Sequence, residues 1–350
     1  MTAIELGLPS LGGLVGVPVA DEPQKAKDYK SDQEVRWCPG CGDYVVLNAV
    51  QSFLPTLGLK RENIVFVSGI GCSSRFPYYM NTYGMHSIHG RAPAIATGLA
   101  VARPDLSVWV VTGDGDALSI GGNHLIHTLR RNVNLKILLF NNRIYGLTKG
   151  QYSPTSEEGK VTKSTPLGSL DHPFNPVSLA LGAEATFVGR AVDSDRAGLT
   201  EVLRQAAEHR GSALVEIYQN CPIFNDGAFD VLKDADEAAR RIITVVHGQP
   251  ITFGGGEYAV VRDGFGLAVA KTSEVAAADV VVHDANDLNL AFALSRLSTQ
   301  DLQHTVTGVI RNVARTTYDD GARAQVEAAK AAKAPDLAGL LRGKDTWTVV

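Results

Sequence analysis

The 350-residue sequence contains few residues of several kinds: four cysteines, three methionines and three tryptophans. It contains no run of 18 apolar residues, so we expect no segment to span a membrane. The net charge of -4 argues against nucleic acid as a partner. The stretch Leu6 to Ala20 is apolar, but no Lys or Arg precedes it and prolines and glycines interrupt it. We therefore expect an ordered N-terminal arm there and no signal peptide.

Two common phosphate-binding motifs are also missing. The sequence has no G-x-x-x-x-G-K-[ST], which excludes a P-loop, and Leu118 stands where a dinucleotide fingerprint starting at Gly113 needs its third small residue. The four cysteines come without an export signal, which indicates a reducing compartment where thiols bind metals and seldom pair as disulfides. We therefore expect a cytoplasmic protein.

With 45% hydrophobic and 20% charged residues, the chain has enough apolar material for one large α/β domain and an appendage. We expect a doubly wound parallel sheet with a small mixed C-terminal extension. The expected divisions are an N-terminal arm and linker over residues 1–34, the α/β domain over 35–229, and the C-terminal extension over 230–350. The pieces of that extension are short, so we expect an arm on a partner subunit that encloses little core of its own.

One stretch of the sequence organises the expected domain. Residues 106–112 form an apolar, β-branched segment typical of a strand buried on both faces, and residues 135–140 form a second one. Between them, residues 117–131 carry apolar side chains at near-helical spacing. This pattern predicts a βαβ unit. Outside it, patterning predicts strands at 64–68, 212–218 and 306–310, a hairpin over 257–271, and helices at 44–54, 92–102, 199–208, 287–297 and 319–333.

Both strands of this unit end in polar turns. Gly113-Asp114-Gly115-Asp116 follows the first, and the second runs into Asn141-Asn142. A right-handed crossover places the Asp114 carboxylate and the Asn142 amide at the same edge of the sheet, where oxygen ligands favour Mg²⁺ over zinc. The flanking glycines and the helix N-terminus suit a diphosphate. Either motif alone is an ordinary turn, but together they form the thiamine diphosphate signature.

Other loops of the sequence also contain candidate functional residues. Residues 69–75 form a glycine turn that contains Cys72, at the carboxyl edge where doubly wound sheets bind ligands. His89 lies in the loop before the helix at 92–102, where a loop histidine held by a backbone bond is the plain alternative to a ligand. The segment Tyr152 to Asn175 is rich in Ser, Thr, Pro and Gly and is too long for a connector, so we expect a site or interface loop.

Three separate loops deliver the four cysteines: Cys38, Cys41, Cys72 and Cys221. Structural zinc sites usually combine two C-x-x-C knuckles, whereas this chain has one knuckle and two isolated cysteines. Cys38 and Cys221 each precede a proline, as in iron–sulfur ligand loops. These features favour a [4Fe-4S] cluster, with zinc or buried thiols without a metal as the alternatives. A cluster close to a thiamine adduct implies one-electron chemistry.

The motifs C-P-G-C-G, G-I-G-C-S-S-R, H-G-R, G-D-G-D and N-N-R-I-Y-G-L-T-K-G-Q occur in this order. In this respect the chain resembles the β subunits of 2-oxoacid:ferredoxin oxidoreductases, closely over residues 35–224 and more loosely to about residue 318. The resemblance implies a subunit that carries the diphosphate half of the thiamine site and one [4Fe-4S] cluster. It implies a complex that converts a 2-oxoacid and CoA into acyl-CoA, CO2 and reduced ferredoxin.

The resemblance also implies a role for individual residues. It assigns the four cysteines to the cluster, and it assigns Asp114, Asn142 and the Ile144 carbonyl to Mg²⁺. The residues it implies as thiamine diphosphate contacts are Ile70, Gly71, Cys72, Ser73, His89, Gly115, Asp116, Gly146 and Leu147. Arg75 is expected to face the substrate carboxylate, with a surface arginine as the alternative. Leu147 and Lys149 are expected to contribute to substrate recognition.

The substrate prediction depends on Lys149. Family members similar to pyruvate enzymes have a glycine at this place, so a lysine there favours a second carboxylate and predicts 2-oxoglutarate as the preferred substrate. A solvated loop lysine is the alternative. No glutamate stands in a setting suited to activate the thiamine ring. The resemblance therefore implies a partner α subunit that supplies this glutamate and most CoA contacts, in an expected α2β2 heterotetramer.

Two other functions remain compatible with the residues alone. One is a non-oxidative thiamine diphosphate-dependent decarboxylase or carboligase whose cysteines bind structural zinc. The other is a non-catalytic assembly subunit, against which the complete set of Asp114, Asn142 and four cysteines argues.

Overall fold

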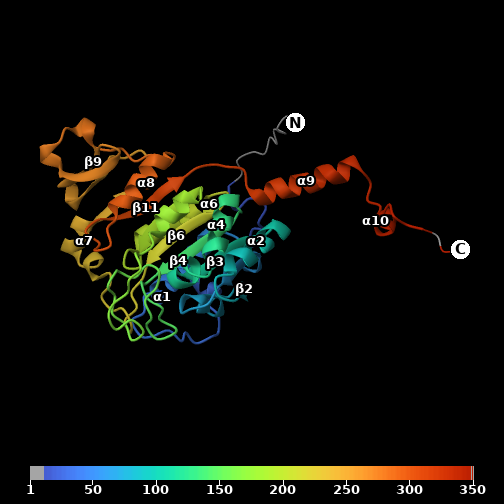
Figure 1. The fold of residues 1–350 in the computed structure, drawn as a ribbon, viewed down its shortest axis with the longest axis horizontal. Helices are drawn as coiled ribbons and strands as arrows, with labels where there is room; N and C mark the ends of the chain where they lie inside the picture. Colours follow the sequence, from blue (N-terminus) through green and yellow to red (C-terminus); the bar gives the residue numbers. More distant parts are fainter. Residues whose placement is uncertain (1–11, 348, 350) are drawn as a thin grey trace.

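A large sheet of eight strands forms the centre of the molecule in the computed structural model, which describes residues 12–347 and 349 (Figure 1). The strand order is β2-β1-β3-β4-β6-β5-β11-β7. The first six strands are parallel, β11 runs antiparallel to β5, and β7 is parallel to β11. The strands are β1 (Ile64–Ser68), β2 (Tyr83–His86), β3 (Ser107–Gly113), β4 (Lys136–Asn141), β5 (Phe187–Val192), β6 (Ala213–Tyr218), β7 (Ile242–Val245) and β11 (Thr305–Asn312).

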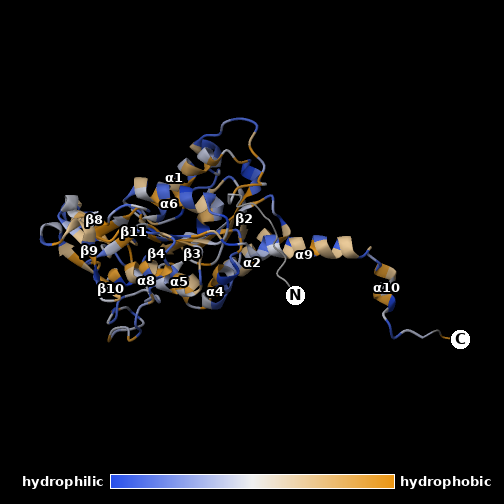
Figure 2. Ribbon diagram, turned by 90° about the horizontal axis from the view of Figure 1, so that it is seen from above, coloured by the Kyte–Doolittle hydropathy of each residue, from blue (hydrophilic) through white to orange (hydrophobic). Residues whose placement is uncertain are grey.

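Helices cover both faces of this sheet, which confirms the predicted doubly wound α/β fold. Figure 2 shows α1 (Asp43–Phe53) and α6 (Arg196–Glu208) on one side. On the other side lie α2 (Ala92–Ala102), α4 (Gly122–Arg131), α5 (Pro176–Gly182) and α8 (Leu288–Leu297). Successive residues of β3 contribute to the two cores in turn, with Trp109 and Val111 packed on one face and Val110 on the other. Burial on both faces explains why the central strands β1, β3 and β4 read as nearly continuous apolar runs.

The predicted βαβ unit is present, and its two strands are direct neighbours. Gly113 pairs with Phe140 at the carboxyl end of the β3–β4 ladder. The single helix predicted over 117–131 is wrong, because α3 (Asp114–Leu118) and α4 are separate helices. The break is where another loop approaches: Gly90 packs so closely on Gly121 that a Cβ at position 90 would lie 2.4 Å from the Gly121 nitrogen, so glycine is required there.

The chain beyond residue 229 is more deeply integrated than its short elements suggested. β7 and β11 extend the large sheet, and Ile243, Val306 and Ile310 are fully buried in its core. The expectation that this stretch encloses little core is therefore wrong for these two strands, while the domain boundaries themselves stay a prediction. The predicted hairpin is present as β9 (Tyr258–Asp263) and β10 (Gly266–Lys271), which form a small antiparallel sheet with β8 (Thr252–Phe253).

The last helices leave the body of the molecule. α9 (Tyr318–Ala332) stands away from the sheet and leads to α10 (Leu337–Arg342), as Figures 1 and 2 both show. The remaining helix, α7 (Ala235–Arg241), directly precedes β7. The first two turns of α9 are held: Arg210 pairs with Asp320 at 2.6 Å, the Asn134 N–H donates to the buried Asp319 at 3.0 Å, and Arg323 donates to the Ala100 carbonyl of α2 at 3.3 Å.

Among the residues described, no helix has both the length and the apolar character to cross a membrane. Of the predicted N-terminal arm, residues 1–11 lie outside the described part of the chain.

Candidate active site

Four neighbouring strands of the sheet end beside the candidate site. These are β1, β3, β4 and β6, which follow one another in the strand order. The turn after β1 contains Cys72, β3 runs into Asp114, β4 runs into Asn142, and Cys221 follows β6 after two residues. The predicted metal and cofactor residues therefore gather at one edge because the parallel order of these strands places them there.

A hollow of about 40 Å³ lies at this edge. It is lined by all nine residues predicted to contact thiamine diphosphate and by Asp114, Asn142 and Ile144, which were predicted to hold the metal. Their roles stay predictions, but the structure brings these distant parts of the sequence to one place. Binding pockets for whole cofactors are roughly ten times larger. The described residues of this chain thus offer one wall of a cofactor site.

In the Gly113–Asp116 turn, the second glycine, Gly115, has a steric reason. A Cβ at Gly115 would lie 2.2 Å from a ring carbon of Tyr145, whose hydroxyl donates to the Gly115 carbonyl at 2.8 Å. A side chain at position 115 would push Tyr145 away and close the approach to the backbone. Tyr145 was not predicted from the sequence.

Asp114 is the central carboxylate of the hollow and is 2% exposed. Its Oδ2 accepts hydrogen bonds from the hydroxyls of Ser153 and Thr155, each at 2.5 Å. Burial raises the pKa of Asp114 to about 6, and the two hydroxyl donors oppose that rise. A buried carboxylate whose charge is only partly compensated is a suitable ligand for a divalent cation.

Asn142 lies across the hollow at the end of β4. Its Oδ1 accepts a hydrogen bond from the Ile144 backbone N–H at 3.2 Å, which folds the chain so that Asn142 and Ile144 border the same hollow. A carboxylate, an amide oxygen and a backbone carbonyl are the hard oxygen ligands that Mg²⁺ takes, so the residues present fit this ion.

The His89 and Asp116 side chains form a pair at the rim of the hollow, and Asp116 is more deeply buried than the sequence suggested. The Asp116 carboxylate accepts from the Gly90 N–H and from the Thr112 hydroxyl, both at 2.9 Å. These protein donors, together with His89, engage both carboxylate oxygens. These bonds hold Asp116 so that it can orient His89, and its predicted contact with the cofactor stays a prediction.

The cysteines lie on the other side of the segment that contains Gly146. A Cβ built on Gly146 would lie 3.4 Å from the Cys72 sulfur and 3.6 Å from the Cys221 sulfur, so both thiols border this glycine. Cys41 is buried and accepts a hydrogen bond from the Gln219 amide at 3.2 Å, and Cys38 is exposed. Because Cys72 and Gly146 also line the hollow, the thiols and the candidate thiamine site are adjacent.

The surroundings of the thiols disfavour free thiolates and suit thiolates bound to a metal cation. Burial, and next the Asp43 carboxylate, raise the pKa of Cys41 above its usual range and that of Cys72 to about 12. Thiolates in this place therefore need positive charge from a metal. Both oxygens of the buried Asp43 also lack a hydrogen-bond partner within the described residues.

Across residues 12–347 and 349, no three His, Cys, Asp or Glu side chains converge tightly enough to hold one metal ion. The [4Fe-4S] cluster and its zinc alternative both stay predictions for these thiols.

Two predicted substrate residues lie beside the hollow and do not line it. Arg75 is half-buried in the short 3₁₀ helix Ser73–Tyr79, close enough to Cys72 that its charge lowers that thiol's pKa against the larger effect of burial. Lys149 is exposed and has a φ of 76°, in the left-handed region that glycine favours. Leu147, the third, lines the hollow and is 44% exposed.

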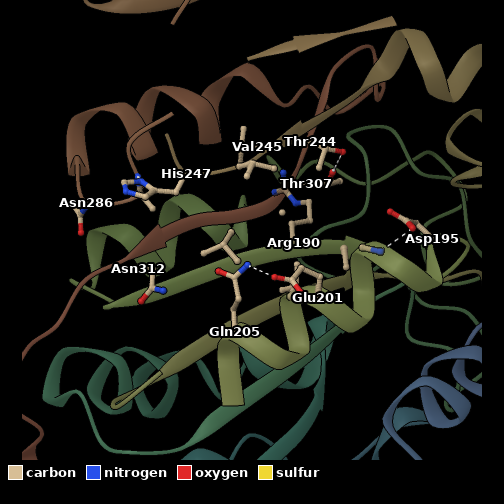
Figure 3. A pocket seen from close by; sticks show the side chains of 17 residues that line it. Arg190, Asp195, Glu201, Gln205, Thr244, Val245, His247, Asn286, Thr307 and Asn312 are labelled. Carbon is tan, nitrogen blue, oxygen red and sulfur yellow. Dashed lines mark hydrogen bonds between the residues drawn. The ribbon is translucent and has the colours of Figure 1, made fainter. Parts of the chain in front are cut away.

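A larger cavity of about 370 Å³ lies elsewhere, between α6 and the strands β7 and β11 (Figure 3). Arg190, Gln205 and His247 are among the residues around it, and Gln205 donates to Glu201 at 2.7 Å. No residue predicted from the sequence as functional lines this cavity. The adjacent metal-type and thiol residues therefore make the hollow at the carboxyl edge the better candidate for an active site.

Comparisons with known proteins agree with this geometry. Residues 69–217 match the family model of the thiamine pyrophosphate enzyme C-terminal TPP binding domain. The chain is 72% identical, over its full length and 95% of the relative, to the 2-oxoglutarate oxidoreductase subunit KorB of Mycobacterium tuberculosis. It is 45% identical over 199 residues, 57% of this chain and 64% of the relative, to the β subunit of 2-oxoacid:ferredoxin oxidoreductase 2 of Aeropyrum pernix.

A solved structure is similar over nearly the whole chain. The 2-oxoglutarate:ferredoxin oxidoreductase of Magnetococcus marinus, determined with 2-oxoglutarate, coenzyme A and succinyl-CoA bound, superposes with a TM-score of 0.75 at 34% identity. The match covers 93% of this chain and 98% of the other. The fold and the site thus define a thiamine diphosphate-binding α/β domain. The chain belongs to the family of 2-oxoglutarate and 2-oxoacid:ferredoxin oxidoreductase β subunits.

Proposed function

We propose that this chain is the β subunit of a 2-oxoglutarate:ferredoxin oxidoreductase, which forms succinyl-CoA and CO2 from 2-oxoglutarate and CoA and passes electrons through a [4Fe-4S] cluster to ferredoxin. The observation that carries this proposal is the contact between two sets of residues at one edge of the sheet. Asp114 and Asn142 border a hollow whose wall, at Cys72 and Gly146, also borders the cysteine thiols. Thiamine diphosphate supplies a carbon nucleophile when bound, and the adjacent cluster accepts electrons one at a time.

In this proposal different residues of the hollow bind different parts of the cofactor. Asp114, Asn142 and the Ile144 carbonyl hold Mg²⁺, and the backbone at Gly115 and Gly71 approaches the diphosphate without a side chain in between. His89, oriented by Asp116, borders the hollow from the opposite loop. Cys38, Cys41, Cys72 and Cys221 hold the cluster.

The substrate assignment is supported by the backbone at Lys149. A lysine at a φ of 76° is strained by about 1 kcal/mol relative to glycine, and backbone strain of this kind gathers at functional sites. We assign Lys149 to the distal carboxylate of 2-oxoglutarate, Arg75 to the carboxylate that leaves, and Leu147 to the wall between them. The names of the mycobacterial and magnetococcal relatives are consistent with this substrate.

A partner subunit is needed to complete the site. The residues that line the hollow include no glutamate, and the enclosed space is too small for the cofactor. Apolar side chains stand open to solvent in β2, in the loop after it and in the α3–α4 turn: Tyr83 (64%), Met85 (42%), Ile88 (68%) and Ile120 (56%). Exposed apolar surface of this kind marks an interface. We assign it to an α subunit in a cytoplasmic α2β2 complex.

The test is reconstitution with and without the α subunit under anaerobic conditions. The complex should be brown, bleach with dithionite, and reduce ferredoxin only when 2-oxoglutarate, CoA and thiamine diphosphate are all present. The β chain alone should bind iron and be inactive. A colourless complex, a chain that turns over at a comparable rate without its partner, or a CoA-independent reaction would contradict the proposal.

A further inference from the structure

The loop over residues 152–175 reaches back to the metal carboxylate with its first residues. Ser153 and Thr155 are 2% and 5% exposed, and both donate to the same Asp114 oxygen, Oδ2, at 2.5 Å. Within the described chain, no side chain donates to the other oxygen, Oδ1. Two donors on one oxygen fix the rotation of the carboxylate, so Oδ1 is the oxygen left for a cation.

The Thr155 hydroxyl lies next to a chain of buried polar groups. Thr155 Oγ1 lies 2.9 Å from the Asn141 amide oxygen, and the Asn141 amide nitrogen donates to Glu216 at 2.7 Å. Glu216 in turn pairs with Arg190 at 2.7 Å, and both side chains of this ion pair are at most 1% exposed. A threonine hydroxyl has a single proton, so Thr155 donates it to Asp114 Oδ2 when Asp114 is ionised. The Asn141 amide oxygen then still accepts a hydrogen bond from the Arg143 N–H at 3.2 Å.

Ser153 and Thr155 directly follow the turn that contains Lys149. This segment is pinched at its base, where the Tyr145 N–H donates to the Gln151 carbonyl at 2.8 Å and the Gly150 N–H donates to the Tyr145 carbonyl at 2.9 Å. On one side it continues from Asn142 and Ile144, and on the other it continues into Ser153 and Thr155. Both ends of the Lys149 turn are thus attached to residues of the metal site.

We propose that Ser153 and Thr155 are positioning residues for the metal ligand Asp114, and that they attach the turn containing Lys149 to the metal site. This inference rests on the proposed function, because it needs Asp114 to bind Mg²⁺. The hydroxyls touch neither metal nor substrate. They act by holding Oδ1 toward the cation and by ordering the loop when the cation is bound.

The test uses the assembled complex with its α subunit and four variants. Ser153→Ala and Thr155→Val remove one hydroxyl each, and Thr155→Ser restores a hydroxyl at that position. Ser169→Ala is the matched control, because Ser169 is equally buried in the same loop and its hydroxyl bonds to Glu157 and Lys160 instead of Asp114. The first readout is the Mg²⁺ concentration that gives half-maximal thiamine diphosphate binding by calorimetry, which requires no turnover.

We expect Ser153→Ala and Thr155→Val to raise that Mg²⁺ concentration about 10- to 100-fold, the range typical of residues that orient metal ligands. Thr155→Ser and Ser169→Ala should bind as the unaltered complex does. The melting temperature without metal, measured alongside, should change little in Ser153→Ala. Should Thr155→Val fail to assemble, Ser153→Ala, which removes a single oxygen atom, decides the question.

The second readout is trypsin cleavage after Lys149 and Lys163, two exposed sites in and beyond the turn. Mg²⁺ with thiamine diphosphate should slow cleavage after Lys149 in the unaltered complex and in Ser169→Ala, and this protection should be lost in Ser153→Ala at the same cofactor concentrations.

Asp114→Ala separates the two levels of the proposal. If Asp114→Ala abolishes Mg²⁺-dependent binding while Ser153→Ala and Thr155→Val leave it unchanged, the positioning role is wrong and the metal site stands. If Asp114→Ala also leaves binding unchanged, the metal assignment itself is wrong.

Discussion

The Nδ1 atom of His89 lies 2.6 Å from the Oδ1 atom of Asp116, and the two side chains differ greatly in exposure, at 46% and 1%. The histidine is thus open on the side of the hollow, and its partner is enclosed by protein. A buried carboxylate that accepts from an imidazole fixes which ring nitrogen points outward. Because of this contrast in burial, substitutions of the two residues should have different effects on stability.

We predict that His89→Ala weakens thiamine diphosphate binding about tenfold with little change in stability, because only an exposed side chain is lost. Asp116→Ala should weaken binding to a similar extent and also destabilise the chain by about 2 kcal/mol, since it leaves the Gly90 N–H and the Thr112 hydroxyl without their acceptor. Calorimetric titration and thermal melting of both variants measure the two effects. Equal stability losses would contradict this division of roles.

The cluster assignment predicts the result of Cys72→Ala. A [4Fe-4S] cluster with three thiolates is labile, so the variant should lose its iron, its visible absorption and its ferredoxin-linked activity together. Ser74→Ala is a suitable control, because Ser74 lies in the same turn, is buried, and its hydroxyl has no hydrogen-bond partner within the described chain. Iron content and the dithionite-bleachable absorption are the measurements. Full iron in Cys72→Ala would mean that this thiol is not a ligand.

The raised pKa of Asp114 predicts opposite effects of acid on stability and on metal binding. Its pKa is about 6 in the folded, metal-free chain and 3.8 in the unfolded chain, so protonation favours the folded state. The contribution of Asp114 to stability without metal should therefore rise as the pH falls from 7 towards 4, by on the order of 1–3 kcal/mol. It is opposed by His209, whose pKa burial lowers to about 3. Mg²⁺ affinity should fall over the same range, because the cation needs the carboxylate.

Asp114→Asn provides the control for this prediction, since the amide does not titrate. Burial also raises the pKa of Asp43, to about 7, so protonation of Asp43 stabilises the folded chain as well. Asp114→Asn should therefore lose only part of the stability gained in acid. Melting curves between pH 4 and 7 measure it. An unchanged pH profile in Asp114→Asn would show that Asp114 ionises normally.

Lys149→Gly tests the basis of substrate choice. Glycine relieves the strain of the positive φ but is freer in the unfolded chain, so stability should stay nearly constant. The ratio of kcat/KM for 2-oxoglutarate over pyruvate should fall about tenfold to a hundredfold in the reconstituted complex, since a charge-assisted bond contributes about 1.5 to 3 kcal/mol. Lys163→Gly, an exposed lysine of the following loop, should leave the ratio unchanged. A constant ratio in Lys149→Gly would exclude it as the selector.

The sequence predicted the parts of the fold that depend on local pattern. The strands β1, β3 and β4 carry nearly continuous apolar runs, and β6 carries one that only Glu216 interrupts. The turns after them contain the signature residues, so both the strands and their common edge could be foreseen. The pairing of β5 with β11 could not, because these residues are more than a hundred positions apart and no local pattern encodes which strands meet. For this reason β7 and β11 were expected in a separate arm.

The candidate site was predictable to the same degree. Residues that a motif marks, such as Asp114 and Cys72, were found, whereas Ser153 and Thr155 were not singled out. The Ser- and Thr-rich composition of residues 152–175 indicated a site loop, but many of its hydroxyls were chemically equivalent in the sequence. Only the path of the folded loop selects the two that reach Asp114.

The direction of β11 has an evolutionary consequence. Because β11 runs antiparallel to β5, its last residue, Asn312, pairs with Phe187 at the beginning of β5. The chain therefore leaves the sheet towards α9 from the edge opposite the hollow, roughly 20 Å away for strands of about six residues. Segments added to the C-terminus of an ancestral subunit would start on this far edge. An addition that starts there leaves the residues that border the hollow untouched.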